Sequence, residues 1–270
     1  MDDSYAENAR QTISTRRLEM DIYKNIPYLF LGGLLTGYAT YSYAEMQNSD
    51  FFNVSGNVLF GTQYNFRGVS MTNRKPTVQG GINFSHKSGA YLNLWASNQN
   101  AYPESSIEAD AFLGYIWTLS EQSYLDIGVV DVNYIGAPSE LNADFNEFNL
   151  IYNRANLFTD KDKFSAALYF SPDYTTSSGK EYYTNISYSY PLNHTFNLFG
   201  SAGYTLLENK EKFLQVFGGE GTQKAYVDYK IGVRATLKGL DAELSWIDTT
   251  IDTSNKNMQG TLYLSVGKSF

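Results

Sequence analysis

The sequence predicts an all-β protein, a transmembrane antiparallel up-and-down β-barrel of about 12 strands after an N-terminal signal peptide. Three observations predict this fold class. Apolar and polar residues alternate along about twelve stretches, the connections between them alternate between short and long, and the 270 residues include 23 Tyr. Successive side chains of a strand point to opposite faces, so the alternation gives each strand one apolar and one polar face. In a closed barrel the apolar faces contact lipid and the polar faces line a lumen.

The overall composition narrows the class of protein. The mean hydropathy of −0.35 argues against a helical membrane protein and fits a barrel, in which half of each strand is polar. The absence of Cys excludes disulfides and zinc–thiolate sites, and the formal net charge of −8 argues against nucleic acid as a partner. A tyrosine-rich soluble sandwich is the alternative that the composition leaves open.

Residues 1–44 are expected to be a leader, and residues 45–270 an outer-membrane β-barrel. The apolar run at 28–39 is too short to span a bilayer as a helix. Ser42 and Ala44 place small residues at the third and first positions before a cut after Ala44. This is the pattern of a secretory signal peptide.

Three alternatives for the leader stay open. Met20 can serve as the start, which makes residues 1–19 an upstream extension; otherwise they are a long initial region of the signal peptide. Arg16 and Arg17 resemble a twin-arginine address, although the apolar run does not follow them closely. The run at 28–39 could also be a buried core helix.

The first expected strand shows the pattern of the whole chain. Phe52, Val54 and Phe60 share one of its faces, whereas Asn53 and Ser55 share the other. Ten or fourteen strands are alternatives to twelve. The expected strands are 52–66, 77–86, 90–98, 106–117, 123–133, 143–154, 163–171, 181–191, 195–204, 226–237, 239–248 and 260–270.

The connections between these strands follow a rule of their own. Those after even-numbered strands are mostly short, as at 86–89 and 238–239. Those after odd-numbered strands are longer and polar, as at 67–76, 172–180 and 205–225. Tight periplasmic turns and long external loops are typical of outer-membrane barrels. The expected even number of strands then places both termini on the periplasmic side.

The last expected strand carries a further signal. Leu262, Leu264 and Val266 share one face with Phe270, the last residue of the chain. Bacterial outer-membrane barrels commonly end in this way, so we expect the barrel-assembly machinery to recognise this strand. Lys268 interrupts the apolar face close to the interface, where a long side chain can reach water.

Several segments of the chain resemble a known family. They include YNFRGVS at 64–70, SGAY at 88–91, WASN at 95–98 and SPDY at 171–174. These segments resemble the TorF family of proteobacterial outer-membrane porins. The resemblance implies a porin-like barrel in the outer membrane of a Gram-negative bacterium. It implies no particular substrate and no catalytic residues.

Nine charged residues are expected to line the pore. If Lys238 and Gly239 form a two-residue turn, Arg234 faces Glu243 across the hairpin and forms an ion pair with it. Two interpretations of the lumen charges stay open. They either orient a permeating solute, with an acid excess favouring cations, or neutralise one another and brace the barrel. The nine residues are Arg67, Glu108, Asp110, Asp126, Glu147, Lys230, Arg234, Asp241 and Glu243.

No catalytic residue, metal site or cofactor is expected. The only histidines, His86 and His194, fall in short expected turns without a plausible Ser–acid partner. We therefore expect a porin-like channel for passive diffusion of small polar solutes, with membrane lipid as its surroundings. The alternative is a closed barrel that serves as a structural anchor or recognises partners through its external loops.

Overall fold

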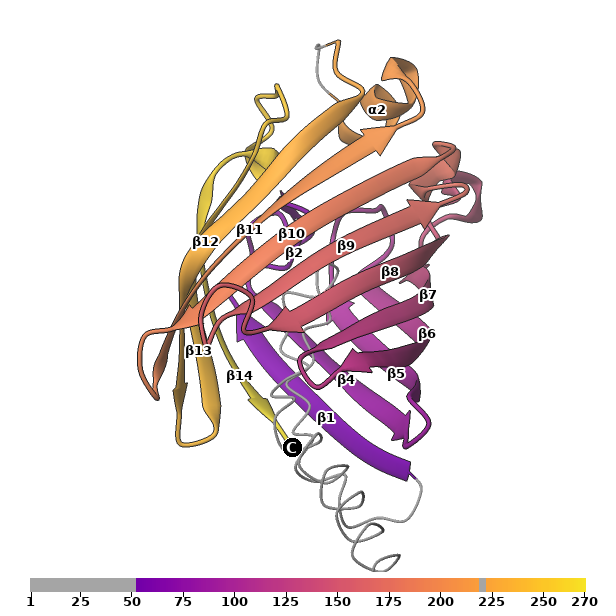
Figure 1. The fold of residues 1–270 in the computed structure, drawn as a ribbon. Coiled ribbons are helices and arrows are strands. Elements are labelled where there is room, and N and C mark those ends of the chain that lie inside the picture. Colours follow the sequence, from indigo (N-terminus) through magenta and orange to yellow (C-terminus); the bar gives the residue numbers. More distant parts are fainter. Residues whose placement is uncertain (1–51, 219–221) are drawn as a thin grey trace, which may run out of the picture.

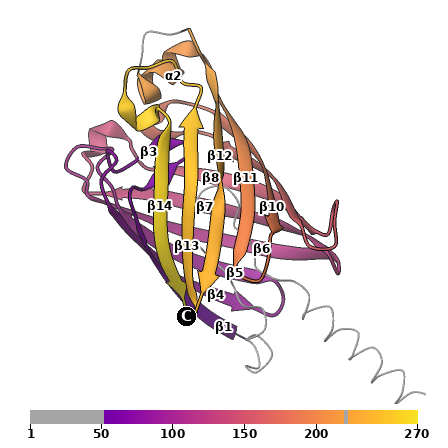
Figure 2. The same cartoon turned by 90° about the vertical axis from the view of Figure 1, so that its left-hand side faces the viewer.

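The protein is a closed barrel of twelve antiparallel strands, seen in a computed structural model that describes residues 52–218 and 222–270 (Figures 1 and 2). Each barrel strand pairs with those before and after it, and the first pairs with the last. The predicted up-and-down barrel is confirmed. The predicted leader and its cleavage site after Ala44 lie outside the described residues. The barrel strands are β1 (Phe52–Gly61), β4 (Thr77–His86), β5 (Ala90–Asn98), β6 (Ile107–Ser120), β7 (Ser123–Ile135), β8 (Phe145–Ala155), β9 (Lys163–Ser171), β10 (Glu181–Pro191), β11 (Phe196–Leu207), β12 (Ala225–Leu237), β13 (Leu240–Thr249) and β14 (Thr261–Ser269).

The first predicted strand is wrong at its end. It was expected to run to residue 66, but β1 ends at Gly61 and the chain then turns into the barrel. There it forms a small hairpin of β2 (Asn65–Phe66) and β3 (Val69–Ser70). The turn of this hairpin is made by Arg67 and Gly68, with φ of 46° and 82°. Such left-handed angles end a strand, because they suit turns and favour glycine.

The predicted loop 205–225 contains the one α-helix of the described residues, α2 (Lys210–Phe217). The side chain of Asn209 caps it by accepting a hydrogen bond from the backbone N–H of Lys212 at 2.9 Å. Phe213 and Phe217 are buried on one side of α2 and pack on Tyr226 of β12. Three short 3₁₀ helices lie in other loops: η2 (Ser139–Leu141), η3 (Thr175–Ser177) and η4 (Lys256–Met258).

The two ends of the barrel differ, as the connections predicted. We call the end with short connections and the C-terminus the turn end, and the opposite end, which carries α2, the loop end (Figure 1). Lys238 and Gly239 form the predicted two-residue turn, because Leu237 pairs directly with Leu240. Both turn residues have positive φ, 54° and 75°, as in the turns that best fit a twisted hairpin.

The outer surface of the barrel is an apolar band. Along β14, Leu262, Leu264 and Val266 are exposed, whereas the alternate residues Tyr263 and Ser265 are buried inside. The same alternation holds on the other strands, so the exposed large apolar side chains surround the barrel. Among the described residues, no helix has the length and apolar character needed to cross a membrane.

The core of the protein lies inside the barrel. The inward faces of β5 to β10 and the hairpin of β2 and β3 together form one cluster, with Tyr64, Phe66, Trp95, Phe112 and Tyr183 among its members. A second cluster lies beneath α2 at the loop end. Side chains therefore fill much of the loop end of the barrel.

An arginine in the middle of the apolar band is expected to destabilise the protein in lipid. Leu264 and Leu240 are similarly exposed, at 49% and 47%, but Leu240 lies next to the turn end. We expect Leu264→Arg to cost about 2–4 kcal/mol and Leu240→Arg about 0–1 kcal/mol, because the penalty falls toward the interface. Urea unfolding in lipid vesicles measures both, and equal costs would contradict a lipid-facing band.

Candidate functional site in the barrel lumen

Residues 62–76, which we call the inward loop, fold into the barrel between β1 and β4. The loop is tied together by hydrogen bonds from Met71 N to Tyr64 O at 2.8 Å and from Tyr64 N to Thr72 Oγ1 at 3.0 Å. At Gly68 a Cβ atom would collide with side-chain atoms of Thr249 and Asp228. Glycine therefore lets the tip of the inward loop approach the wall formed by β12 and β13.

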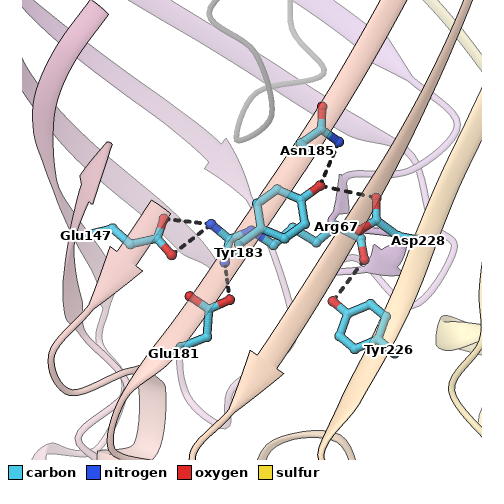
Figure 3. A network of polar contacts seen from close by, with 7 residues as sticks. All are labelled: Arg67, Glu147, Glu181, Tyr183, Asn185, Tyr226 and Asp228. Atoms are coloured by element: carbon cyan, nitrogen blue, oxygen red, sulfur yellow. Dashed lines mark hydrogen bonds and ion pairs between the residues drawn. The ribbon is translucent and has the colours of Figure 1, made fainter. Parts of the chain in front are cut away.

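Arg67 fixes the inward loop to the opposite side of the lumen (Figure 3). Its Nη2 donates to both carboxylate oxygens of Glu147 on β8, at 2.7 and 2.8 Å. Its Nη1 donates to Glu181 on β10 at 2.8 Å. The guanidinium carbon lies 4.0 Å from the ring centroid of Tyr183, and the Tyr226 hydroxyl donates to the Arg67 carbonyl oxygen at 3.0 Å. Three strands thus hold one loop residue.

This network is almost completely removed from water. The side chain of Arg67 is 1% exposed, and those of Glu147 and Glu181 are 0% exposed. A buried charge costs free energy unless it is paired and hydrogen-bonded, and here one guanidinium serves two carboxylates. The arrangement joins the inward loop to β8 and β10 at once, because the same guanidinium binds an acid on each strand.

The acids on the neighbouring wall bind tyrosine hydroxyls. Glu108 on β6 accepts a hydrogen bond from Tyr64 at 2.8 Å, and Asp126 on β7 accepts one from Tyr91 at 2.8 Å. Burial, together with the charges of Glu108 and Asp110, raises the pKa of Tyr64 well above its ordinary value. The Tyr64 hydroxyl therefore stays protonated and remains a donor to Glu108.

A second ion-pair group lies on β12 and β13, nearer the turn end. Glu243 receives Lys230 Nζ at 2.5 Å and Arg234 Nε at 2.9 Å, one on each carboxylate oxygen. The predicted ion pair between Arg234 and Glu243 is thus present, in the predicted register. The Arg234 guanidinium also stacks on Phe199, 3.9 Å from the ring centroid.

The nine predicted residues divide into separate groups. The structure joins Arg67 with Glu147, and it joins Lys230 and Arg234 with Glu243. Asp241 lies apart near the turn end and accepts a hydrogen bond from Thr236 at 2.6 Å. Except for Arg234 and Asp241, which are partly exposed, the nine residues are buried: Arg67, Glu108, Asp110, Asp126, Glu147, Lys230 and Glu243.

Three lumen charges were not predicted: Lys163, Glu181 and Asp228. Glu181 and Lys163 are the first residues of their strands, β10 and β9, where the boundary with the preceding loop hides the alternation. The two-residue alternation of a strand does indicate two of these residues. Glu181 lies two positions before the inward Tyr183, and Asp228 lies two positions before the inward Lys230, so both face the lumen.

Burial differs between the two halves of the lumen. We call the half of the lumen nearer the loop end the loop half, and there the inward loop and its partners are almost wholly buried. In the other half, which we call the turn half, inward-facing polar residues keep partial exposure, as at Asn57, Ser187, Asn197 and Ser201. Because their strands turn the apolar face outward, this exposure is toward the barrel interior. Small polar side chains therefore line the turn half.

The closed antiparallel barrel with an apolar outer surface and a polar lumen is a fold that solved structures share. The chain is similar to a KdgM porin, with 10% identity, a TM-score of 0.52, and coverage of 80% of this chain and 99% of that one. It is similar to a NanC porin, with 10% identity, a TM-score of 0.53, and coverage of 80% and 98%. At this identity the likeness shows the fold alone.

The family is shown by a match to its sequence profile. The chain belongs to the Gcw_chp family, described as "Bacterial protein of unknown function", and the match covers residues 45–270. No curated protein matches the chain.

Removing the Arg67 guanidinium is expected to destabilise the protein strongly. Arg67→Met leaves Glu147 and Glu181 buried without their cation, which costs about 3–5 kcal/mol for a broken buried pair. The triple variant R67M/E147Q/E181Q removes all three charges and is expected to recover much of this loss. Urea unfolding in vesicles gives the free energies.

A matched control lies on the same loop. Arg74 is partly exposed and binds the carbonyl of Gln259 at 2.7 Å, so Arg74→Met is expected to change stability by less than about 1 kcal/mol. Equal losses for Arg67→Met and Arg74→Met would contradict the docking role of Arg67.

Proposed function

We propose that the protein is a porin-like channel in the outer membrane of a Gram-negative bacterium, through which small polar solutes diffuse passively. The observation that carries the proposal is the closed barrel with an apolar outer band and a lumen lined by charged and small polar side chains. Polar residues that stay partly exposed in the turn half supply a path for hydrated solutes.

Other observations support this reading. The sequence segments that resemble the TorF porins favour a channel. The fold is also shared with proteins named as porins. The family match begins at residue 45, directly after the expected signal-peptide cleavage site. We infer that the turn end faces the periplasm, with both termini there, and that the assembly machinery recognises the strand ending at Phe270. Phe270 pairs with Gly56 of β1 through two backbone hydrogen bonds.

The position of the histidines supports a channel over an enzyme. His86 is the last residue of β4 and His194 lies in the connection between β10 and β11, so both are at the turn end. Several acids of the lumen are bound by arginine, lysine or tyrosine, as at Glu147, Glu243 and Glu108. Their pairing suits a structural and electrostatic role.

In the proposed mechanism the inward loop is the constriction. Arg67 holds it against β8 and β10, while its tip approaches β12 and β13 at Gly68. Solute size is then selected where this loop narrows the lumen. A twelve-stranded barrel encloses more space than an eight-stranded one, whose interior is filled by its own side chains.

One observation favours the second candidate function. The buried cluster around Tyr64, Trp95 and Phe112 packs the loop half of the lumen, as in a closed barrel. In that case the loops and α2 at the loop end would act as an anchor or a recognition surface. The two functions differ in whether ions cross the barrel.

Single-channel recording in planar bilayers tests the proposal. The purified protein is expected to give stepwise conductance, and replacing residues 63–75 by a short Gly-Ser linker is expected to raise the conductance severalfold by removing the constriction. Arg74→Ala, a change at a partly exposed position of the same loop, is expected to leave the conductance unchanged. A folded wild-type protein that gives no conductance would favour the closed barrel.

A further inference from the structure

We propose that the barrel wall carries a binding site for a guanidinium group, which the chain's own Arg67 occupies and which a small guanidinium-bearing solute takes over. The wall residues of this site are Glu147, Glu181, Tyr169 and Tyr183, and we call them the guanidinium pocket. The proposal rests on the proposed channel function, since it names a class of solute that releases the inward loop.

The acids of the pocket match the shape of a guanidinium (Figure 3). One terminal nitrogen of Arg67, Nη2, lies 2.7 and 2.8 Å from the two carboxylate oxygens of Glu147. The other terminal nitrogen, Nη1, lies 2.8 Å from Glu181. A guanidinium presents its donors in a planar fork, whereas an ammonium is a compact point charge. The two acids therefore favour a guanidinium over a simple amine.

Two tyrosine rings complete the pocket. The guanidinium carbon of Arg67 lies 4.0 Å from the ring centroid of Tyr183 and 5.4 Å from that of Tyr169. These tyrosines pair directly in the register of β9 and β10, and their ring centroids are 5.8 Å apart. Both are buried. An aromatic ring attracts a cation most strongly where water is excluded, so the rings add to the affinity for a cation.

The pocket and its occupant are separate parts of the fold. All four pocket residues belong to the adjacent barrel strands β8, β9 and β10, whose backbone pairing fixes their relative positions. Arg67 belongs to the inward loop, 80 and 114 positions away in the sequence from the two acids. A second molecule that carries the same chemical group can therefore compete with Arg67 for the wall.

Arg67 satisfies the pocket only in part. Among the described residues, Glu147 and Glu181 form ion pairs with Arg67 alone, so one cation serves two buried acids. In the same part of the chain, Glu181 Oε2, Ser171 Oγ and Arg67 Nε are buried without a hydrogen-bond partner. Ser171 pairs with Glu181 in the register, so its hydroxyl adjoins the pocket. Unpaired buried groups cost free energy, and a solute free of the loop can orient its N–H groups toward these oxygens.

The turn that carries Arg67 is strained. Its φ of 46° lies in the left-handed region, which residues other than glycine rarely adopt. The next residue, Gly68, approaches Thr249 and Asp228 so closely that a Cβ atom would collide with them. Such conformations cost free energy and persist only where the surrounding contacts enforce them. Departure of Arg67 from the pocket lets this turn relax, which favours the exchange.

Exchange at the pocket is coupled to the width of the lumen. Arg67 joins the inward loop, the proposed constriction, to β8 and β10. The side chains of Arg67, Glu147 and Glu181 are at most 1% exposed, so a solute binds only after Arg67 has moved away. A solute that binds this state alone increases its population as the solute concentration rises. The lumen is then wider than in the docked state.

The first experiment measures binding without conductance. R67A removes all side-chain atoms beyond Cβ, which together correspond to ethylguanidinium. Ethylguanidinium chloride is expected to raise the melting temperature of R67A in detergent by several degrees. At equal ionic strength, neutral ethylurea and ethylammonium, which lacks the planar fork, are expected to leave it unchanged.

Two variants are the controls for this measurement. R74A changes a partly exposed residue of the same loop, and R67M/E147Q/E181Q lacks both acids of the pocket. Neither is expected to be stabilised by ethylguanidinium.

The second experiment tests the exchange in the wild-type protein, so it does not depend on the folding of R67A. In planar bilayers, ethylguanidinium is expected to raise the single-channel conductance severalfold, toward that of the protein with residues 63–75 replaced by a linker. R67K, whose ammonium does not fit the fork, is expected to respond at lower ethylguanidinium concentrations. R67M/E147Q/E181Q is expected not to respond.

The outcomes separate the inference from the channel function. A wild-type conductance that ethylguanidinium leaves unchanged overturns the inference and leaves the channel standing, as does a folded R67A that ethylguanidinium does not stabilise. Equal effects of ethylammonium overturn the assignment to a guanidinium group. Stabilisation of R67A by ethylguanidinium, in a protein that conducts no ions, supports the pocket and overturns the channel.

Discussion

Closure of the ring is the constraint on which the rest of this structure depends. In hydrocarbon no water can satisfy a backbone N–H or C=O group, so a sheet that spans a membrane cannot keep an open edge. Here β1 pairs with β14, and the last residue, Phe270, exchanges two hydrogen bonds with Gly56 at 2.7 and 2.9 Å. Once the ring is closed, the period of two assigns every side chain to lipid or to the lumen.

The enclosed space is larger than the strands fill, and the inward loop occupies it. A loop that enters a barrel brings polar backbone and, here, the charge of Arg67 into a site without water. Burying such a charge does not by itself add stability, because desolvation offsets the attraction to Glu147 and Glu181. What the network adds is position, since one guanidinium must meet acids on β8 and β10 together.

Local patterns in the sequence predict most of the fold, and contacts between distant residues supply the rest. The alternation predicted the strands, and the turn at Lys238 and Gly239 predicted the register that joins Arg234 to Glu243, only nine residues away. The docking of Arg67 joins residues 80 and 114 positions apart, for which no local pattern exists. The apolar and polar alternation also continues past Gly61, so the end of β1 depends on packing inside the barrel and could not be read from the sequence.

The charged residues of the lumen differ in how far they are buried and paired. The chain has a net charge of −8, and its lumen acids outnumber its lumen bases. Yet a field acts on a solute mainly through charges that are near it and poorly neutralised. Glu147 and Glu181 both form ion pairs with Arg67 and are buried. Arg234 stays partly exposed and shares the carboxylate of Glu243 with Lys230. The ion pairs of the loop half are thus wholly buried, whereas the pair of Arg234 and Glu243 in the turn half stays partly exposed.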